Sequence, residues 1–328
     1  MRLIFAGSPA FAIPGLERLL AGRHEVVAVV TQPARPAGRG LVLTDPPVKV
    51  AALRHGLEVH QPEIFNSSKF LDMLESLRPD LIVTAAYGRI FKSRALGLPR
   101  RGCVNLHASL LPKYRGVAPI NWAIINGEAE TGVTTFFMDQ GVDTGDLILS
   151  HTTAILPDET AGELTARLAA LGAEVLAETC DLVESGKAQR VKQDQSLASY
   201  APKLAKGDGR VGWDQDARAV HNRIRGVNPW PGAFCQFRAQ VLKLLASRLP
   251  DYRMGVWGPK MAGGDSGGRE PAVAGRGRVI GIDSRDGILV SCSSGSVWLR
   301  MLQAQGKKPT SGADFARGYR IKIGDSFG

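Results

Sequence analysis

Continuous apolar runs alternate with segments of helical pattern in the first half of this chain, and this alternation most constrains its fold. The runs RLIFAG, EVVAVVT, DLIVTAA and CVNLH are apolar at most positions, which is typical of strands buried on both faces. Helical patterns lie between them at 14–22, 46–56 and 67–78; the first has Pro14 near its start and Gly22 just past its end. We therefore predict an α/β fold with a doubly wound, mostly parallel sheet.

The pattern changes after a longer helical segment at about 159–185. Residues 189–206 are polar and irregular, as in a linker. From Gly232 on, the apolar runs RVIGID, GILVSC and SVWLRML are short and separated by Gly or Asp, which predicts a small antiparallel β-barrel. We expect a first domain at 1–188, a linker at 189–206 and a second domain at 207–328.

The two halves of the chain differ in charge. Residues 1–199 carry 20 Lys and Arg against 21 Asp and Glu, whereas residues 200–328 carry 21 against 10. A near-neutral half joined to a half of net charge +11 indicates that the second half meets a polyanion. The alternative is a basic surface that serves only solubility.

The compartment follows from what the chain lacks. No apolar run reaches the roughly 18 residues of a membrane helix, and the start MRLIFAGSPAF does not have the pattern of a signal peptide. The four cysteines are scattered without a Cys-x-x-Cys pair, which favours reduced thiols. We expect a cytoplasmic protein that does not meet a membrane.

The run CVNLH ends with an amide and an imidazole two residues apart, Asn105 and His107. Alternate residues of a strand project to the same face, so both side chains point the same way. Sites in parallel sheets lie beyond the carboxyl ends of the strands, where this pair falls. The segment MDQGVDTGDLI then offers Asp139, Asp143 and Asp146, and we expect one of them to reach His107.

These residue types are suited to acyl transfer. An imidazole oriented by a carboxylate moves a proton, while amide and imidazolium N–H groups stabilise an oxyanion. No hydroxyl or thiol is clearly placed as a nucleophile, which favours direct transfer over a covalent acyl-enzyme. On spacing alone, the Asn-x-His pair is also compatible with a purely structural role.

Two other patterns carry no function in our interpretation. The segment GDSGG, residues 264–268, matches the serine-protease signature but lies in a Gly- and Pro-rich stretch at 258–277, for which we expect a flexible loop. The start FAGSPA lacks the Gly-x-Gly-x-x-Gly of dinucleotide-binding sheets, and the phosphate-loop and zinc-protease motifs are absent too. The sheet therefore need not bind a nucleotide.

Several segments together resemble one enzyme family. VNLHASLLPKYRGVAPI resembles the signature of the folate-dependent formyltransferases, and GVTTFFMDQGVDTGDLI resembles their second block. TQPARPAGRG, PDLIVTAAYGRI, YAPKLAKGDGRVGW and IRGVNPWPGAF narrow the resemblance to the methionyl-tRNA formyltransferases. The resemblance is dense up to about Phe234 and thinner after it.

The resemblance implies transfer of the formyl group of 10-formyltetrahydrofolate, the co-substrate, to the amino group of methionine on initiator tRNA. It assigns catalysis to Asn105, His107 and Asp143, and it implies a Rossmann-like formyltransferase domain followed by an oligonucleotide-binding (OB)-like barrel. It also assigns folate contacts to a four-residue loop: Ser109, Leu110, Leu111 and Pro112. We expect no metal and no obligate protein partner, and a monomer.

For the tRNA, the resemblance points to the loop TQPARPAGRG, with Arg35 and above all Arg39. The family usually follows this Arg-Gly with lysines, whereas this chain has Leu41, Val42 and Leu43. Fewer cations predict weaker phosphate contacts and less salt dependence. In the basic half, we expect Lys307 and Lys308 to meet the tRNA body.

We expect Trp230 in the rigid segment NPWPGAF to pack at the domain junction rather than to stack on RNA. Two alternatives to the whole interpretation remain. One is the same chemistry with a small amine acceptor, against which the basic half and the arginine loop argue. The other is a catalytically silent RNA-binding protein, against which the Asn105, His107 and Asp143 set argues.

Overall fold

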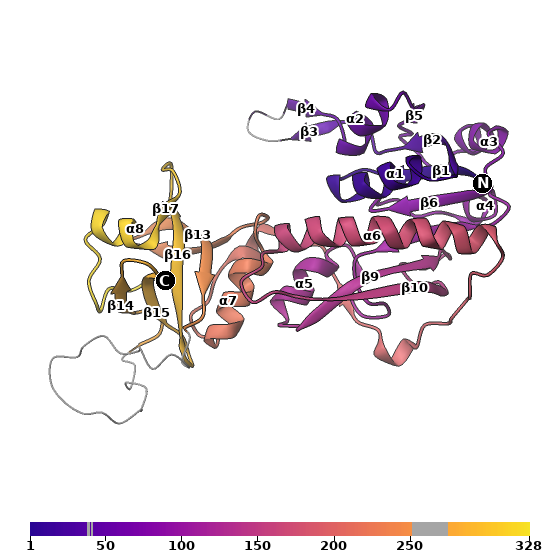
Figure 1. The fold of residues 1–328 in the computed structure, drawn as a ribbon. Helices are drawn as coiled ribbons and strands as arrows, with labels where there is room; N and C mark the ends of the chain where they lie inside the picture. Colours follow the sequence, from indigo (N-terminus) through magenta and orange to yellow (C-terminus); the bar gives the residue numbers. More distant parts are fainter. Residues whose placement is uncertain (38–39, 41, 251–274) are drawn as a thin grey trace. The chain divides into compact units, whose positions relative to one another are not determined.

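A computed structural model describes residues 1–37, 40, 42–250 and 275–328 of the chain, which forms two compact units (Figure 1). The units interleave along the sequence. Unit 1 comprises Met1–Ile120, Glu130–Ala154 and Glu163–Lys203, and unit 2 comprises Asn121–Ala129, Ile155–Gly162 and Leu204–Gly328. Arg39, Leu41 and the GDSGG segment lie outside the described residues.

Unit 1 contains a seven-stranded sheet in the order β10-β9-β7-β6-β1-β2-β5. The five strands β5, β2, β1, β6 and β7 are parallel, and β9 and β10 are antiparallel additions beside β7. Their bounds are β1 Arg2–Gly7, β2 Glu25–Val30, β5 Val59–His60, β6 Leu81–Ala85, β7 Cys103–His107, β9 Glu130–Phe137 and β10 Leu147–Ala154. The predicted doubly wound, mostly parallel sheet is confirmed.

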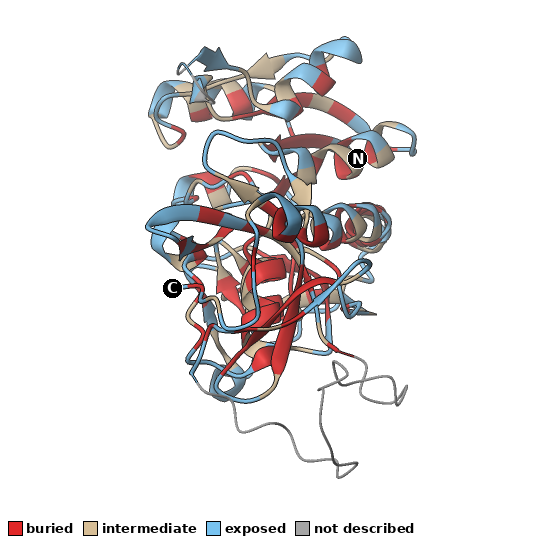
Figure 2. Cartoon of the chain, turned by 90° about the vertical axis from the view of Figure 1, so that its left-hand side faces the viewer, coloured by how far each residue is buried: buried red, intermediate tan, exposed pale blue. Residues whose placement is uncertain are grey.

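Helices cover both faces of this sheet, as the alternation along β1 requires. Ile4 and Ala6 pack with Leu71 and Leu74 of α3 on one face. On the other face, a Cβ at Gly15 of α1 would lie 3.2 Å from Leu176 of α6, with the Phe5 ring at 3.9 Å. Figure 2 shows the resulting pattern, with buried strands and helices exposed on their outer sides. These apolar layers position the strand ends where the polar residues lie.

Apart from the short α4, which the sequence analysis did not predict, the helices of this unit agree with the expected segments. They are α1 Ile13–Leu20, α2 Pro47–Arg54, α3 Ser68–Ser76, the short α4 Ser93–Leu96 and, starting at the boundary of the units, α6 Ala161–Glu184. A further helix, α5 Pro119–Ile125, also spans a boundary between the units. Of the described helices, none has the length and apolar composition needed to cross a bilayer.

Two pairs of short strands accompany the large sheet. The hairpin of β3, Arg35–Ala37, and β4, Val42–Thr44, follows β2. The second pair joins β8, Arg115–Gly116, to β11, Tyr200–Ala201, in parallel. β11 belongs to the segment 189–206 that the sequence presents as a linker, and this segment packs within unit 1 up to Lys203.

Unit 2 is built on an antiparallel sheet in the order β12-β13-β16-β15-β14, with β17 paired to β16. The strands are β12 Ala233–Phe237, β13 Gln240–Arg248, β14 Val279–Asp283, β15 Gly287–Ser291, β16 Ser296–Ala304 and β17 Thr310–Ser311. Helices α7, Ala217–Gly226, and α8, Gly312–Gly318, contribute Val220, Ile224 and Phe315 to its core. The predicted antiparallel architecture is confirmed, while closure into an OB-like barrel stays a prediction.

Candidate active site

Strand β7 brings Asn105 to the carboxyl edge of the sheet, between β6 and β9. Asn105 is half-buried and lies in register with Thr84 on one side and Phe136 on the other. The Thr84 hydroxyl donates to Asn105 Oδ1 over 2.6 Å. Because this bond occupies the carbonyl end of the amide, Nδ2 is the end left to donate to a ligand.

His107, two residues further, is 6% exposed and has a defined tautomer. Its Nε2 lies 2.9 Å from the backbone oxygen of Tyr114. A carbonyl only accepts, so Nε2 carries a proton and Nδ1 is the nitrogen open to proton exchange.

Asp143 is the carboxylate that reaches this imidazole. Its Oδ2 lies 3.6 Å from His107 Nδ1 and accepts a hydrogen bond from the Gly116 N–H over 2.8 Å. The other two candidates serve elsewhere: Asp139 accepts from Gly141 and Thr144 within its own turn, and Asp146 lies 3.9 Å from Arg190. The structure therefore pairs His107 with Asp143, and Asn105 lies two residues before His107 on the same strand.

The loop after β7 is held by one side-chain hydrogen bond of its own and by Thr134 of β9. The Ser109 hydroxyl is fully buried and donates to the Lys113 carbonyl over 2.6 Å. Thr134 on β9 donates to the Ser109 carbonyl over 2.7 Å and accepts from the Leu111 N–H over 3.2 Å. Leu111 is buried, and Leu110 and Pro112 are half-buried. This geometry fixes the turn behind His107, and direct folate contacts by these four residues stay a prediction.

The expected tRNA-binding residues fall in both units. Arg35 is exposed on β3, and its hairpin partner β4 exposes Val42 and Leu43, which are 65% and 68% exposed. Lys307 and Lys308 are exposed in the loop after β16. Trp230, which we expected to pack at the domain junction, is 51% exposed, so about half of its surface is accessible to solvent. Its role at the junction stays a prediction.

A cavity of about 400 Å³ lies among the loops that follow β5 and β6, at the carboxyl edge of the sheet. Sequence reasoning did not assign it. The exposed side chains of Ile64 and Ile90 line it, together with Asn66 and Arg89. In the sequence, the only sign of this cavity is the segment YGRI directly after a buried strand. The position of the cavity fits the crevice in which open α/β sheets bind ligands.

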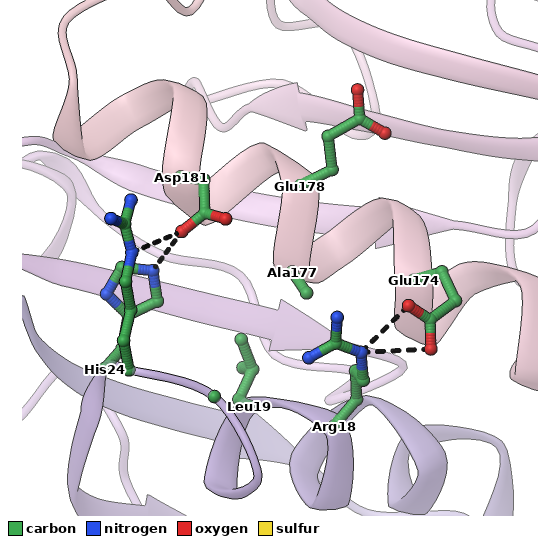
Figure 3. Close-up of a pocket in the computed structure, with 9 residues that line it drawn as sticks. Arg18, Leu19, His24, Glu174, Ala177, Glu178 and Asp181 are labelled. Carbon is green, nitrogen blue, oxygen red and sulfur yellow. Dashed lines mark hydrogen bonds and ion pairs between the residues drawn. The ribbon is translucent and has the colours of Figure 1, made fainter.

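A second cavity, of about 280 Å³, lies between α1 and α6, away from these strand ends (Figure 3). Its charges are already paired: Arg18 binds Glu174 at 2.9 Å, and Arg23 binds Asp181 at 2.9 Å. His24, Asp181 and Glu184 lie close enough to share a metal ion, but Arg23 contacts both carboxylates. Since a cation already balances this cluster, we assign no site to it.

Comparison with known families identifies the class of enzyme to which this fold belongs. Residues 1–180 match the model of the formyl transferase family, and residues 203–320 match that of the formyl transferase C-terminal domain. The chain belongs to the formyl transferase family.

Relatives narrow the class. Methionyl-tRNA formyltransferase of Geotalea uraniireducens is 46% identical over all of this chain and 98% of its own length. That of Acetivibrio thermocellus is 43% identical over the full length of both chains. These identities extend through both units.

Solved structures share the fold. The sugar 3N-formyl transferase WlaRD, determined with dTDP and 5-N-formyl-THF, superposes with a TM-score of 0.65 at 18% identity, over 94% of this chain and 99% of its own. An N-formyltransferase of Helicobacter canadensis, in complex with folinic acid and dTDP-3-aminofucose, gives a TM-score of 0.62 at 19% identity, over 92% and 98%.

Proposed function

We propose that this chain transfers the formyl group of 10-formyltetrahydrofolate to the α-amino group of methionine on initiator Met-tRNA. The observation that carries the proposal is the His107–Asp143 pair at the carboxyl end of β7, with Asn105 two residues before His107 on the same strand. The relatives named methionyl-tRNA formyltransferase, which match over the whole chain, support this choice of acceptor.

The chemical step is a direct attack of the amine on the formyl carbon. A free α-amino group has a pKa of about 7.7–8.0, and esterification of the carboxyl lowers it, so much of the amine is neutral at cellular pH. A new C–N bond to methionine forms a tetrahedral intermediate. The Asn105 Nδ2 donates to its oxyanion, because Thr84 holds the other end of the amide.

Collapse of the intermediate breaks the bond between the formyl carbon and N10 of the folate. The proton lost by the methionine nitrogen passes to the His107 Nδ1–Asp143 Oδ2 pair, and from there to N10. Nδ1 is the exchanging atom, since Nε2 is bonded to Tyr114. Each step is assigned to a protein group or to substrate, and the scheme needs no metal ion.

The substrates would approach from the carboxyl edge of the sheet. We infer that the folate uses the loop Ser109–Pro112 and the cavity lined by Ile64 and Ile90. Exposed Arg35, together with Arg39, is suited to the acceptor end of the tRNA, and Lys307 and Lys308 to its phosphates. We further propose a cytoplasmic monomer, with the second domain formed mainly by unit 2.

The test measures formyl transfer from 10-formyltetrahydrofolate to methionyl-initiator tRNA, methionyl-elongator tRNA and a small amine, such as an amino sugar nucleotide, in parallel. We expect transfer to the initiator alone. Transfer to the small amine alone would contradict the assignment of Met-tRNA as the acceptor but leave the proposed roles of Asn105, His107 and Asp143 in place. Binding of tRNA without any transfer would support an RNA-binding protein instead.

A further inference from the structure

We propose that Gln193 is a positioning residue for the reaction: it connects the buried Arg115 to the loop that carries Asp143, and so sets Asp143 against His107. Neither Gln193 nor Arg115 touches the reacting atoms in the scheme above. The inference rests on the proposed function, because it concerns how the same site is held in its active geometry.

Arg115 is the fixed end of this connection. It is the largest fully buried side chain described, with 1% of the residue exposed. Its Nε and Nη2 donate to Gln193 Oε1 over 3.1 and 2.7 Å, and its Nη1 donates to Gln195 Oε1 over 2.8 Å. Hydrogen bonds from a charged donor are stronger than neutral ones, so a buried guanidinium holds both amides firmly in place.

Gln193 also forms hydrogen bonds with the loop that carries Asp143. Its Nε2 donates to the backbone oxygens of Asp143 and Gly145 over 2.9 and 2.8 Å. The single side-chain amide therefore accepts from Arg115 and donates to two loop carbonyls, so its two ends are both used. Asp143 has a φ of 55°, a left-handed conformation that is uncommon for non-glycine residues, although aspartate adopts it more often than most of them.

The backbone on either side of Arg115 contacts both partners of the pair. The Tyr114 oxygen accepts from His107 Nε2, and the Gly116 N–H donates to Asp143 Oδ2. The backbone of residues 114–116 thus orients the imidazole and the carboxylate, while the Arg115 side chain orders the Asp143 backbone through Gln193. Misplacement of a reacting group by about 1 Å is enough to cost roughly a hundredfold in rate.

The chain offers a matched control. Gln193 and Gln195 both accept from Arg115, but only Gln193 also bonds to the Asp143 loop. Gln193→Ala and Gln195→Ala should each remove an acceptor of Arg115. Gln193→Ala should lose more thermal stability, because Gln193 is buried and makes four of these hydrogen bonds, whereas Gln195 is exposed and accepts one from Arg115. We expect Gln193→Ala to lower kcat roughly 10- to 100-fold with KM for both substrates changed less than about threefold. Gln195→Ala should keep kcat within about threefold of wild type.

A second variant separates positioning from folding. Gln193→Glu keeps an acceptor for Arg115, now as an ion pair, but replaces the two donors by an oxygen facing carbonyls. We expect a folded protein that is destabilised no more than Gln193→Ala, because the ion pair with Arg115 offsets part of the repulsion, and that has the same low kcat as Gln193→Ala. Wild-type kcat in Gln193→Glu, or equal kcat losses in Gln193→Ala and Gln195→Ala, would overturn the inference. Failure of the wild-type enzyme to formylate Met-tRNA would instead contradict the proposed function.

Discussion

The Nδ1 atom of His107 lies 3.6 Å from Oδ2 of Asp143, and the other nitrogen of the ring is bonded to the Tyr114 carbonyl. This distance exceeds an ordinary hydrogen bond, so the pair is close enough for charge interaction yet open to an entering proton. One imidazole nitrogen therefore anchors the ring, and the other is free for chemistry.

Replacing His107 by Ala should abolish detectable formyl transfer, because the exchanging Nδ1 is lost. Asp143→Asn keeps the shape of the side chain but not its charge, and we expect kcat to fall by about 10²- to 10⁴-fold. Single-turnover transfer to Met-tRNA measures both effects, with circular dichroism as the check on folding. Near-normal turnover of His107→Ala would contradict the proposed proton route.

Replacing Asn105 by Ala removes the proposed oxyanion donor, a change that typically raises the barrier by about 2.7–4 kcal/mol. We expect a kcat loss of about 10²- to 10³-fold with little change in KM. Thr84→Val is the companion variant, since it keeps Asn105 but deletes the 2.6 Å bond that orients it. It should give a smaller loss of the same kind, and a pure KM effect in either variant would argue for substrate binding instead.

The sequence predicted the fold and part of the site for one physical reason: both are local. Buried runs such as Leu81–Ala85 show the strands of a parallel sheet, and the two-residue spacing of Asn105 and His107 shows a shared face. The family resemblance added Asp143, which spacing could not separate from Asp139 and Asp146.

The part of the site and the fold that the sequence did not predict depends on contacts between residues far apart in the chain. Arg115 and Gln193 are 78 positions apart, and Gln193 lies in a polar segment that has the composition of a linker. Nothing in that composition reveals a glutamine that will meet a buried arginine. The interleaving of the two units at 121–129 and 155–162 is hidden for the same reason.

Gly116→Ala should damage both stability and catalysis. Gly116 has a φ of 115°, and a Cβ there would lie 2.8 Å from the Ala201 oxygen, so the backbone that donates to Asp143 must move. We expect a loss of about 2 kcal/mol in the free energy of unfolding and at least a tenfold lower kcat. Gly186→Ala is the control, because its φ is 70° but its surroundings are open. It should cost about 1 kcal/mol and leave kcat unchanged; equal kcat in the two variants would contradict this account.

Unit 2 should lose stability in mild acid because of His221. This side chain is buried. Its Nε2 donates to the Pro157 carbonyl, and its Nδ1 bonds to the Ser247 hydroxyl. Burial holds the pKa of His221 below its usual value. The folded state therefore binds this proton less readily than the unfolded state, so the stability present above about pH 6.5 falls as the pH drops toward the lowered pKa. Thermal unfolding between about pH 8 and pH 5 measures the slope. In His221→Gln the slope should be shallower, and an unchanged slope would assign the acid sensitivity to other groups.

We expect the salt dependence of tRNA binding to rest in part on Lys307 and Lys308. Both are exposed after β16, in the half of the chain with excess positive charge. Each phosphate contact contributes about 0.9 to the slope of log K against log salt for duplex nucleic acid, so the double variant Lys307→Ala/Lys308→Ala should flatten that slope by about 1–2. The KM for 10-formyltetrahydrofolate should not change, since neither lysine belongs to the unit that carries His107. Lys69→Ala on α3 is the control and removes one charge instead of two. A change in slope half as large as that of the double variant would show that only net charge matters, not the place of these two lysines.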